Sequence, residues 1–111
     1  MPRPWRRLTG LCGAGLVLAL AGTGCTSIWA RTRVSAAQTA VDSASQAGAE
    51  KKAPYAYTSA LLYLEKAREE EAYARFGPAV EFSDLSEKYA EQAVQTVNSG
   101  APEAALSATK P

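Results

Sequence analysis

The sequence predicts an all-α protein, either an antiparallel helical hairpin or a three-helix bundle, that follows a cleaved signal peptide. From residue 28 onward the chain is rich in alanine, glutamate, lysine, glutamine and serine, most of which favour helices. Its apolar residues recur at steps of three and four, and no stretch sustains the apolar–polar alternation of a strand. Pro54 and the pair Gly77-Pro78 divide this part of the chain into three segments.

The first 24 residues have the three-part order of a secretory signal peptide. Residues 1–7 (MPRPWRR) are basic, residues 8–20 (LTGLCGAGLVLAL) are apolar, and residues 21–24 (AGTG) are small. Cleavage after Gly24 would remove three of the twelve basic residues, so the eleven acidic residues would be in excess in the mature chain.

A cysteine directly follows the small residues, and the run Gly22-Thr23-Gly24-Cys25 resembles the cleavage motif of bacterial lipoproteins. It departs from that motif at Gly22, where leucine is usual. The resemblance implies cleavage between Gly24 and Cys25 and acylation of Cys25. Two alternatives stay open, an ordinary secreted protein and an uncut membrane anchor, although residues 8–21 fall short of the ~20 apolar residues that span a bilayer.

The residues after Cys25 bear on the choice of membrane. Thr26 and Ser27 follow it, whereas aspartate at that place is the usual retention signal for the inner membrane of enteric bacteria. By this resemblance we expect a lipid anchor in the outer membrane, with the protein on its periplasmic face. The membrane is then one expected partner of the chain, reached through the lipid on Cys25.

The first helical segment is expected from about residue 28 to residue 50. Residues 25–33 hold the lipid-attachment cysteine and the start of this helix, and residues 34–98 form the helical domain. One face carries small residues at steps of three and four, which a neighbouring helix can approach closely: Ala30, Val34, Ala37, Val41, Ala44 and Gly48. Lys51 and Lys52 suit the C-terminus of this helix, and Pro54 suits the first turn of the next.

The second helix is expected over about residues 55–76 and the third over about residues 79–98. Gly77-Pro78 forms the link between them, with the glycine as a left-handed cap, and so short a link makes the two helices antiparallel. The expected core residues of the second helix are Tyr57, Ala60, Leu61, Leu64 and Ala67. Those of the third are Phe82, Leu85, Tyr89 and Ala93, with Ala90 and Val97 beside them. Residues 99–111 are expected to form a disordered tail.

The segment from about residue 34 to residue 97 resembles the bacterial domain of unknown function 4398. This family is an alanine-rich helical module found in lipoproteins and beside peptidoglycan-binding outer-membrane domains. The residues that carry the resemblance are Ala36-Ala37, Val41, Ala53-Pro54-Tyr55, Ala60, Leu64, Ala67, Leu85, Ala90 and Ala93. The hairpin also resembles a single tetratricopeptide unit, of which a solenoid needs about three. The family implies no catalytic residues.

The predicted mature chain lacks the residue types on which catalysis and metal binding most often depend. The sequence has no histidine, the commonest general base and metal ligand. Cys12 would leave with the signal peptide and Cys25 would be blocked by lipid, so no thiol would remain. The carboxylates of residues 65–91 lie among other charges and are expected on solvated helix surfaces. We therefore expect no enzyme, no metal or other cofactor, no small-molecule substrate and, without a basic cluster, no nucleic-acid partner.

The tyrosines are the remaining candidate site residues: Tyr55, Tyr57, Tyr63, Tyr73 and Tyr89. One interpretation is partial burial, with each hydroxyl reaching water. The other is an aromatic groove that binds a partner protein or peptide.

Together these observations predict a non-catalytic, lipid-anchored protein of the cell envelope that serves as a structural or protein-interaction subunit, with another envelope protein as its partner. The alternatives are an accessory assembly factor of an envelope machine, similar to a pilotin or chaperone, and an unanchored secreted helical protein. A covalent wall tether similar to the major murein lipoprotein is not expected. Lys110 is followed by Pro111, and Pro54 and Pro78 interrupt any continuous coiled coil.

Overall fold

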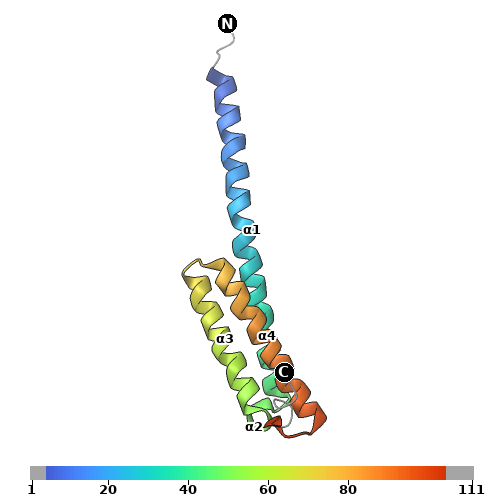
Figure 1. Ribbon diagram of the computed structural model, residues 1–111. Coiled ribbons are helices and arrows are strands. Elements are labelled where there is room, and N and C mark those ends of the chain that lie inside the picture. Colours follow the sequence, from blue (N-terminus) through green and yellow to red (C-terminus); the bar gives the residue numbers. More distant parts are fainter. Residues whose placement is uncertain (1–4, 105–111) are drawn as a thin grey trace.

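The computed structural model describes residues 5–104, with side chains from Cys25 onward, and this part of the chain is helical and contains no strand (Figure 1). Its helices are α1 (Trp5–Gln46), α2 (Ala49–Lys52), α3 (Pro54–Ala72) and α4 (Phe76–Ser99). Helices α3 and α4 form an antiparallel hairpin, and the second half of α1 packs against both, more extensively against α4. The predicted all-α hairpin with a leading helix is therefore confirmed, as a helical bundle.

The first half of α1 extends away from the bundle as a single helix (Figure 1). Most of the predicted signal peptide falls on this half, while residues 1–4, and residues 105–111 of the expected tail, lie outside the described range. Among the described residues, no helix has a stretch both long enough and apolar enough to cross a membrane.

The second half of α1 uses the predicted small-residue face to join the bundle. Ala30, Val34, Ala37, Val41 and Ala44 are all buried. The predicted end of this helix near residue 50 is wrong, because α1 ends at Gln46 and the separate turn of α2 follows. The break falls at Gly48, whose φ of 82° is the left-handed conformation that glycine adopts without steric cost.

Helix α3 begins as predicted at Pro54, but its end and the link to α4 differ from the prediction. Proline fits the first helical turn, where its missing N–H has no helical partner. The link predicted at Gly77-Pro78 is wrong: the corner lies at residues 73–75, and Ala74 adopts the left-handed conformation with a φ of 57°. Gly77 and Pro78 sit inside the first turn of α4, where proline is tolerated for the same reason as in α3.

The core consists almost entirely of alanine. Eleven of the fourteen buried hydrophobic residues among those described are alanines, and the other three are Val34, Val41 and Leu64. Leu64 is buried as predicted, with 3% of its surface exposed, whereas Leu61, also predicted for the core, is exposed. Side chains this short let the three long helices approach closely, so little apolar volume holds the bundle together.

The predicted core face of α4 is only partly right. Ala90 and Ala93 are buried, but Phe82, Leu85, Tyr89 and Val97 are half-buried. The rest of the buried face consists of Ala79, Ser83, Ser86 and Thr96. Because α4 lies between two neighbours, its small residues occupy the close contacts and its large residues move to the flanks.

The buried hydroxyls of α4 are satisfied within the bundle. Ser83 Oγ donates to the carbonyl of Ala79 at 2.8 Å, within α4. Ser86 Oγ donates to the carbonyl of Ala60 at 2.7 Å and so links α4 to α3. A buried hydroxyl with a partner avoids the desolvation penalty of an unpaired one, which explains how serine can stand at core positions.

Candidate functional site

The predicted lipid-attachment residue lies where α1 leaves the bundle. Cys25 is exposed, and the first buried core residue of α1, Ala30, follows five positions later. The predicted cleavage point between Gly24 and Cys25 lies within the continuous helix α1. Cleavage there would leave a chain that starts a little over one turn before the packed part of α1.

Three of the five candidate tyrosines come together between α3 and α4. The Tyr63 ring stacks on Tyr89, with centroids 5.5 Å apart and planes 11° apart. Tyr63 also stacks on Phe82 at 6.2 Å, and Tyr55 meets Tyr89 edge-on at 6.4 Å. We call Tyr55, Tyr89, Tyr63 and Phe82, in this spatial order, the aromatic row.

The aromatic row lies on the side of the hairpin away from α1. Asp84 and Glu87 of α4 contact Arg33 of α1. At 100° per residue, Phe82 and Tyr89 project from the opposite flank of α4. Tyr63, Phe82 and Tyr89 are half-buried, and Tyr55 is 60% exposed. The row is therefore open to solvent at least at its Tyr55 end.

The other two candidate tyrosines lie elsewhere. Tyr57 is half-buried against the core. Tyr73 is exposed at the corner between α3 and α4, where the guanidinium of Arg75 lies 5.1 Å from its ring centroid. The sequence prediction missed Phe82 as a member of the row and assigned it to the core. Its seven-residue spacing from Tyr89, two helical turns, is the pattern that places both rings on one flank.

Burial affects the ionisation of one ring in the row. The pKa of Tyr89 is raised above the ordinary tyrosine value, chiefly because burial disfavours the phenolate. The neighbouring Tyr55 and Tyr63 raise this pKa further. Tyr89 therefore stays protonated at physiological pH, and its hydroxyl is a neutral hydrogen-bonding group.

The Tyr55 end of the row is held by a carboxylate from beyond α4. Glu103 accepts hydrogen bonds from the backbone N–H of Tyr55 at 3.1 Å and of Ala56 at 2.6 Å. Helix α3 has no side-chain cap of its own at Ala53, so Glu103 satisfies otherwise unpaired N–H groups at this terminus. Part of the segment expected to be a disordered tail thus contacts the bundle.

Glu70 departs from the expectation that the carboxylates of residues 65–91 are solvated. It is buried, with Arg75 Nε 2.6 Å and Lys66 Nζ 3.4 Å from its carboxylate oxygens. The corner turns Arg75 back onto the end of α3, which is why the carboxylate is covered. The Glu70 carboxylate, paired with both cations, joins the corner at Arg75 to the end of α3 and so stabilises the hairpin; we call this ion-paired group the clamp.

Ion pairs also fix α1 on the hairpin. Arg33 donates through Nε to Asp84 at 3.0 Å and through Nη2 to Glu87 at 3.3 Å. The pKa of Arg33 is raised, mainly by the hydrogen bond with Asp84. These contacts connect α1 to α4 beside the small-residue core.

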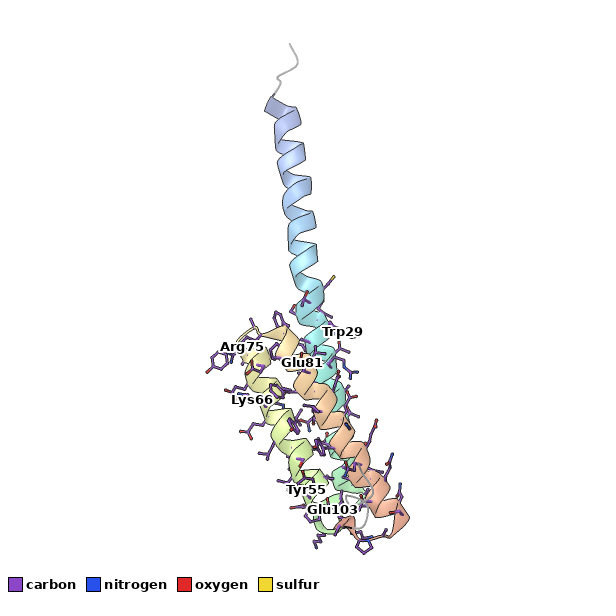
Figure 2. All side chains as sticks on the ribbon, in the orientation of Figure 1. Trp29, Tyr55, Lys66, Arg75, Glu81 and Glu103 are labelled. Atoms are coloured by element: carbon purple, nitrogen blue, oxygen red, sulfur yellow. The ribbon has the colours of Figure 1, made fainter. Side chains whose placement is uncertain are left out.

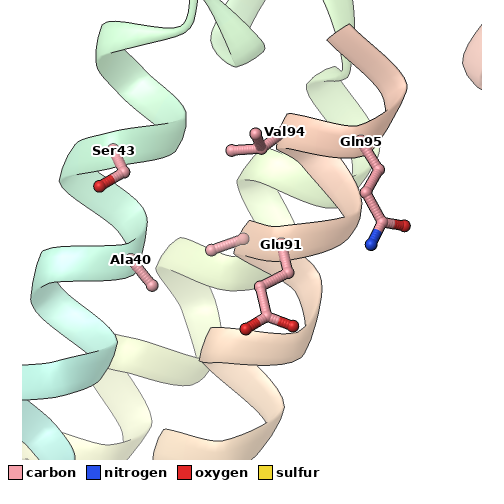
Figure 3. Close-up of a pocket in the computed structure, with 6 residues that line it drawn as sticks. Ala40, Ser43, Glu91, Val94 and Gln95 are labelled. Atoms are coloured by element: carbon pink, nitrogen blue, oxygen red, sulfur yellow. The ribbon is translucent and has the colours of Figure 1, made fainter. Parts of the chain in front are cut away.

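A shallow groove of about 360 Å³ lies between α1 and α4 (Figure 3). Its lining residues are Ala40, Ser43, Ala90, Glu91, Val94 and Gln95. The hydroxyl of Ser43 donates to the carbonyl of Thr39 at 3.0 Å and is occupied within α1. Within the part of the chain that the structure describes, no three histidine, cysteine or acidic side chains lie close enough together to hold a metal ion.

These features define a small, alanine-rich helical bundle with one uncovered aromatic flank. The chain belongs to the family described as Domain of unknown function (DUF4398), which matches residues 32–109. The match begins at residue 32, within the packed part of α1, and covers all of the hairpin. No curated protein and no solved structure matches the chain at a significant level.

Proposed function

We propose that this protein is a non-catalytic, lipid-anchored component of the bacterial cell envelope that binds a protein partner through the aromatic row. The observation that carries the proposal is the uncovered flank of the hairpin. Tyr55 and Leu62 are each 60% exposed there, two helical turns apart on α3. Stacked rings continue the surface across α4.

The chemistry of this flank suits protein recognition. Tyrosine offers a large apolar face and a hydroxyl, and it loses little conformational entropy on binding because its side chain has few rotatable bonds. The ring stacking already orders Tyr63 and Tyr89, which lowers that cost further. Aromatic residues of this kind dominate the binding energy of many protein interfaces.

The anchor is supported by the sequence before Cys25 and by the position of Cys25 itself. An exposed cysteine at the edge of the packed part of α1 would let a lipid reach a bilayer without disturbing the core. Thr26 and Ser27 favour the outer membrane, where the bundle would face the periplasm. An accessory assembly factor of a larger envelope machine is the narrower form of the same proposal.

The anchor is tested by acyl labelling in cells. Cys25→Ser is expected to abolish palmitate incorporation and to leave uncleaved precursor, while Cys12→Ser, within the predicted signal peptide, is the matched control and should label as the wild type does. One acyl chain holds a protein to a membrane only marginally, whereas two hold it stably. The Cys25→Ser variant should therefore also lose the lipid-dependent membrane attachment that survives washing. Undiminished labelling of Cys25→Ser would refute the anchor.

The partner surface is tested by a photo-reactive amino acid placed at Leu62 in the full chain. The control is the same amino acid at Leu61, which is also exposed but lies on the α1 side of α3. Illumination of intact cells should give a cross-linked species of defined mass from position 62 and not from position 61. Equal cross-linking from both positions, or from neither, would refute binding through this flank.

A further inference from the structure

One end of the bundle brings together two segments that are distant in the sequence. Residues 25–31 of α1 lie beside residues 72–78, the corner and the first residues of α4. Ser27 and Arg31 line one surface hollow together with Ala72 and Phe76. Trp29 and Arg75 both lie at this end, opposite Tyr55 and Glu103 (Figure 2). We call these two segments the Cys25 end.

The Cys25 end exposes three large apolar side chains. Ile28 and Tyr73 are each 67% exposed and Trp29 is 61% exposed. Ile28 and Trp29 come from α1 and Tyr73 from the corner, so apolar groups lie on both sides of the end. Neither the core nor the aromatic row uses them. Tryptophan and tyrosine are the side chains enriched at membrane–water interfaces, where their rings meet both apolar and polar surroundings.

The charged side chains of the Cys25 end itself are arginines. Residues 25–31 and 72–78 contain Arg31 and Arg75 but no acidic residue. The two carboxylates that directly precede residue 72 in the sequence form ion pairs with these arginines. Glu71 Oε1 lies 3.4 Å from Arg31 Nε, and Glu70 is buried against Arg75. The side chain of Arg31 is still 84% exposed. The side chain of Arg75 is 55% exposed, whereas those of Glu70 and Glu71 are 8% and 22% exposed, so the guanidinium groups face solvent more than their paired carboxylates do. The exposed Glu81 lies further along α4 (Figure 2).

The spacing from Cys25 matches the thickness of a lipid headgroup layer. Trp29 follows Cys25 by four residues, about 6 Å along a helix. The polar layer on each side of a bilayer is about 5–8 Å deep. Acyl chains on Cys25 would enter the hydrocarbon, so Ile28 and Trp29 would fall within the adjacent polar layer.

We infer that the Cys25 end lies in the headgroup layer of the membrane, with Ile28, Trp29 and Tyr73 inserted and with Arg31 and Arg75 against anionic lipid phosphates. The inference rests on the proposed acylation of Cys25 and adds a fixed orientation to it. The bundle then stands on the membrane by this end. Tyr55 and Glu103 lie at the opposite end of the bundle (Figure 2), which would then point away from the bilayer.

The test uses Trp29 as its own reporter. The sequence has two tryptophans, and Trp5→Phe leaves Trp29 alone whether or not the signal peptide is removed. The protein is purified from envelopes in detergent and reconstituted into vesicles of phosphatidylethanolamine and phosphatidylglycerol that contain brominated phosphatidylcholine. We expect blue-shifted Trp29 emission, strong quenching by the bromolipid, and weak quenching by aqueous acrylamide. Mass spectrometry of the same sample shows whether Cys25 is acylated.

Two relocated tryptophans provide matched controls, each in a chain that also carries Trp5→Phe and Trp29→Phe. Tyr73→Trp should be quenched by the bromolipid, because it lies at the Cys25 end. Tyr55→Trp should be quenched only by acrylamide, because it lies at the opposite end. Both replace exposed tyrosines, so both chains should fold.

The outcomes separate the inference from the proposed anchor. An acylated protein in which Trp29 and the tryptophan at position 73 behave like the one at position 55 would overturn the inference and leave the anchor intact. An unacylated protein whose Trp29 is still quenched by bromolipid would overturn the anchor and support contact between this end and lipid. An unacylated, unquenched protein would overturn both.

Discussion

Replacing Leu64 by alanine should remove a large part of the stability of the bundle. Leu64 is the one leucine among the buried hydrophobic residues that the structure describes, and it is 3% exposed. Loss of three buried carbon atoms costs about 2.5 kcal/mol in transfer free energy, at roughly 0.8 kcal/mol per methylene. The surrounding core is mostly alanine, whose short side chains cannot refill the cavity, so the total should reach about 3–4 kcal/mol.

The assay is thermal unfolding followed by far-ultraviolet circular dichroism on the chain from Thr26 to Pro111. A loss of this size should lower the Tm by roughly 12–30 °C in a domain of this length. Leu62→Ala is the control, because it makes the same replacement at an exposed position of the same helix and should change stability by less than about 0.5 kcal/mol. If Leu64→Ala and Leu62→Ala melt at the same temperature, Leu64 is not packed in the core of the bundle.

Three further perturbations test the contacts that close the bundle. Glu103→Gln should cost about 1 kcal/mol in denaturant unfolding, because the N-terminus of α3 loses its anionic cap; an unchanged midpoint would show that the cap contributes nothing. Arg75→Ala should cost about 2 kcal/mol by leaving Glu70 buried with only Lys66, and adding Glu70→Gln should recover part of the loss; no recovery would contradict the clamp. The raised pKa of Tyr89 means that folding favours its protonated form, so this contribution to stability is complete below about pH 10 and is lost as the pH rises through the folded-state pKa. Tyr89→Phe should therefore show a shallower alkaline decline in its unfolding midpoint than the wild type, and identical slopes would refute the assignment.

Some elements of the bundle could be predicted because their causes are local. The small-residue face of α1 repeats at helical spacing, so the buried positions from Ala30 to Ala44 follow from periodicity alone. Pro54 can only begin a helix or interrupt one, and it begins α3. Leu64 lies in the middle of its helix on the apolar face, where burial was the natural expectation.

The membership of the candidate site could be predicted only in part. Tyr55, Tyr63 and Tyr89 were singled out because tyrosines are numerous in so small a chain, but nothing in their spacing says which of them meet. Rings from two helices stack only after the register of the hairpin is set, and this register excludes Tyr57 and Tyr73 from the row and includes Phe82.

Local sequence is enough to predict the helical class, the packed face of α1 and the start of α3, because these depend on neighbours within a few residues along the chain. Three other features depend on how the helices pack together. Packing places the corner at Ala74 instead of Gly77, turns the small polar face of α4 inward, and brings Glu103 to the N-terminus of α3. Each depends on groups far apart in sequence: Ser86 is satisfied by Ala60, and the cap that α3 lacks locally comes from beyond α4. A hydrophobic pattern predicts burial from the hydrophobicity of each side chain. In this bundle, burial depends instead on how closely the backbones of the three long helices approach one another.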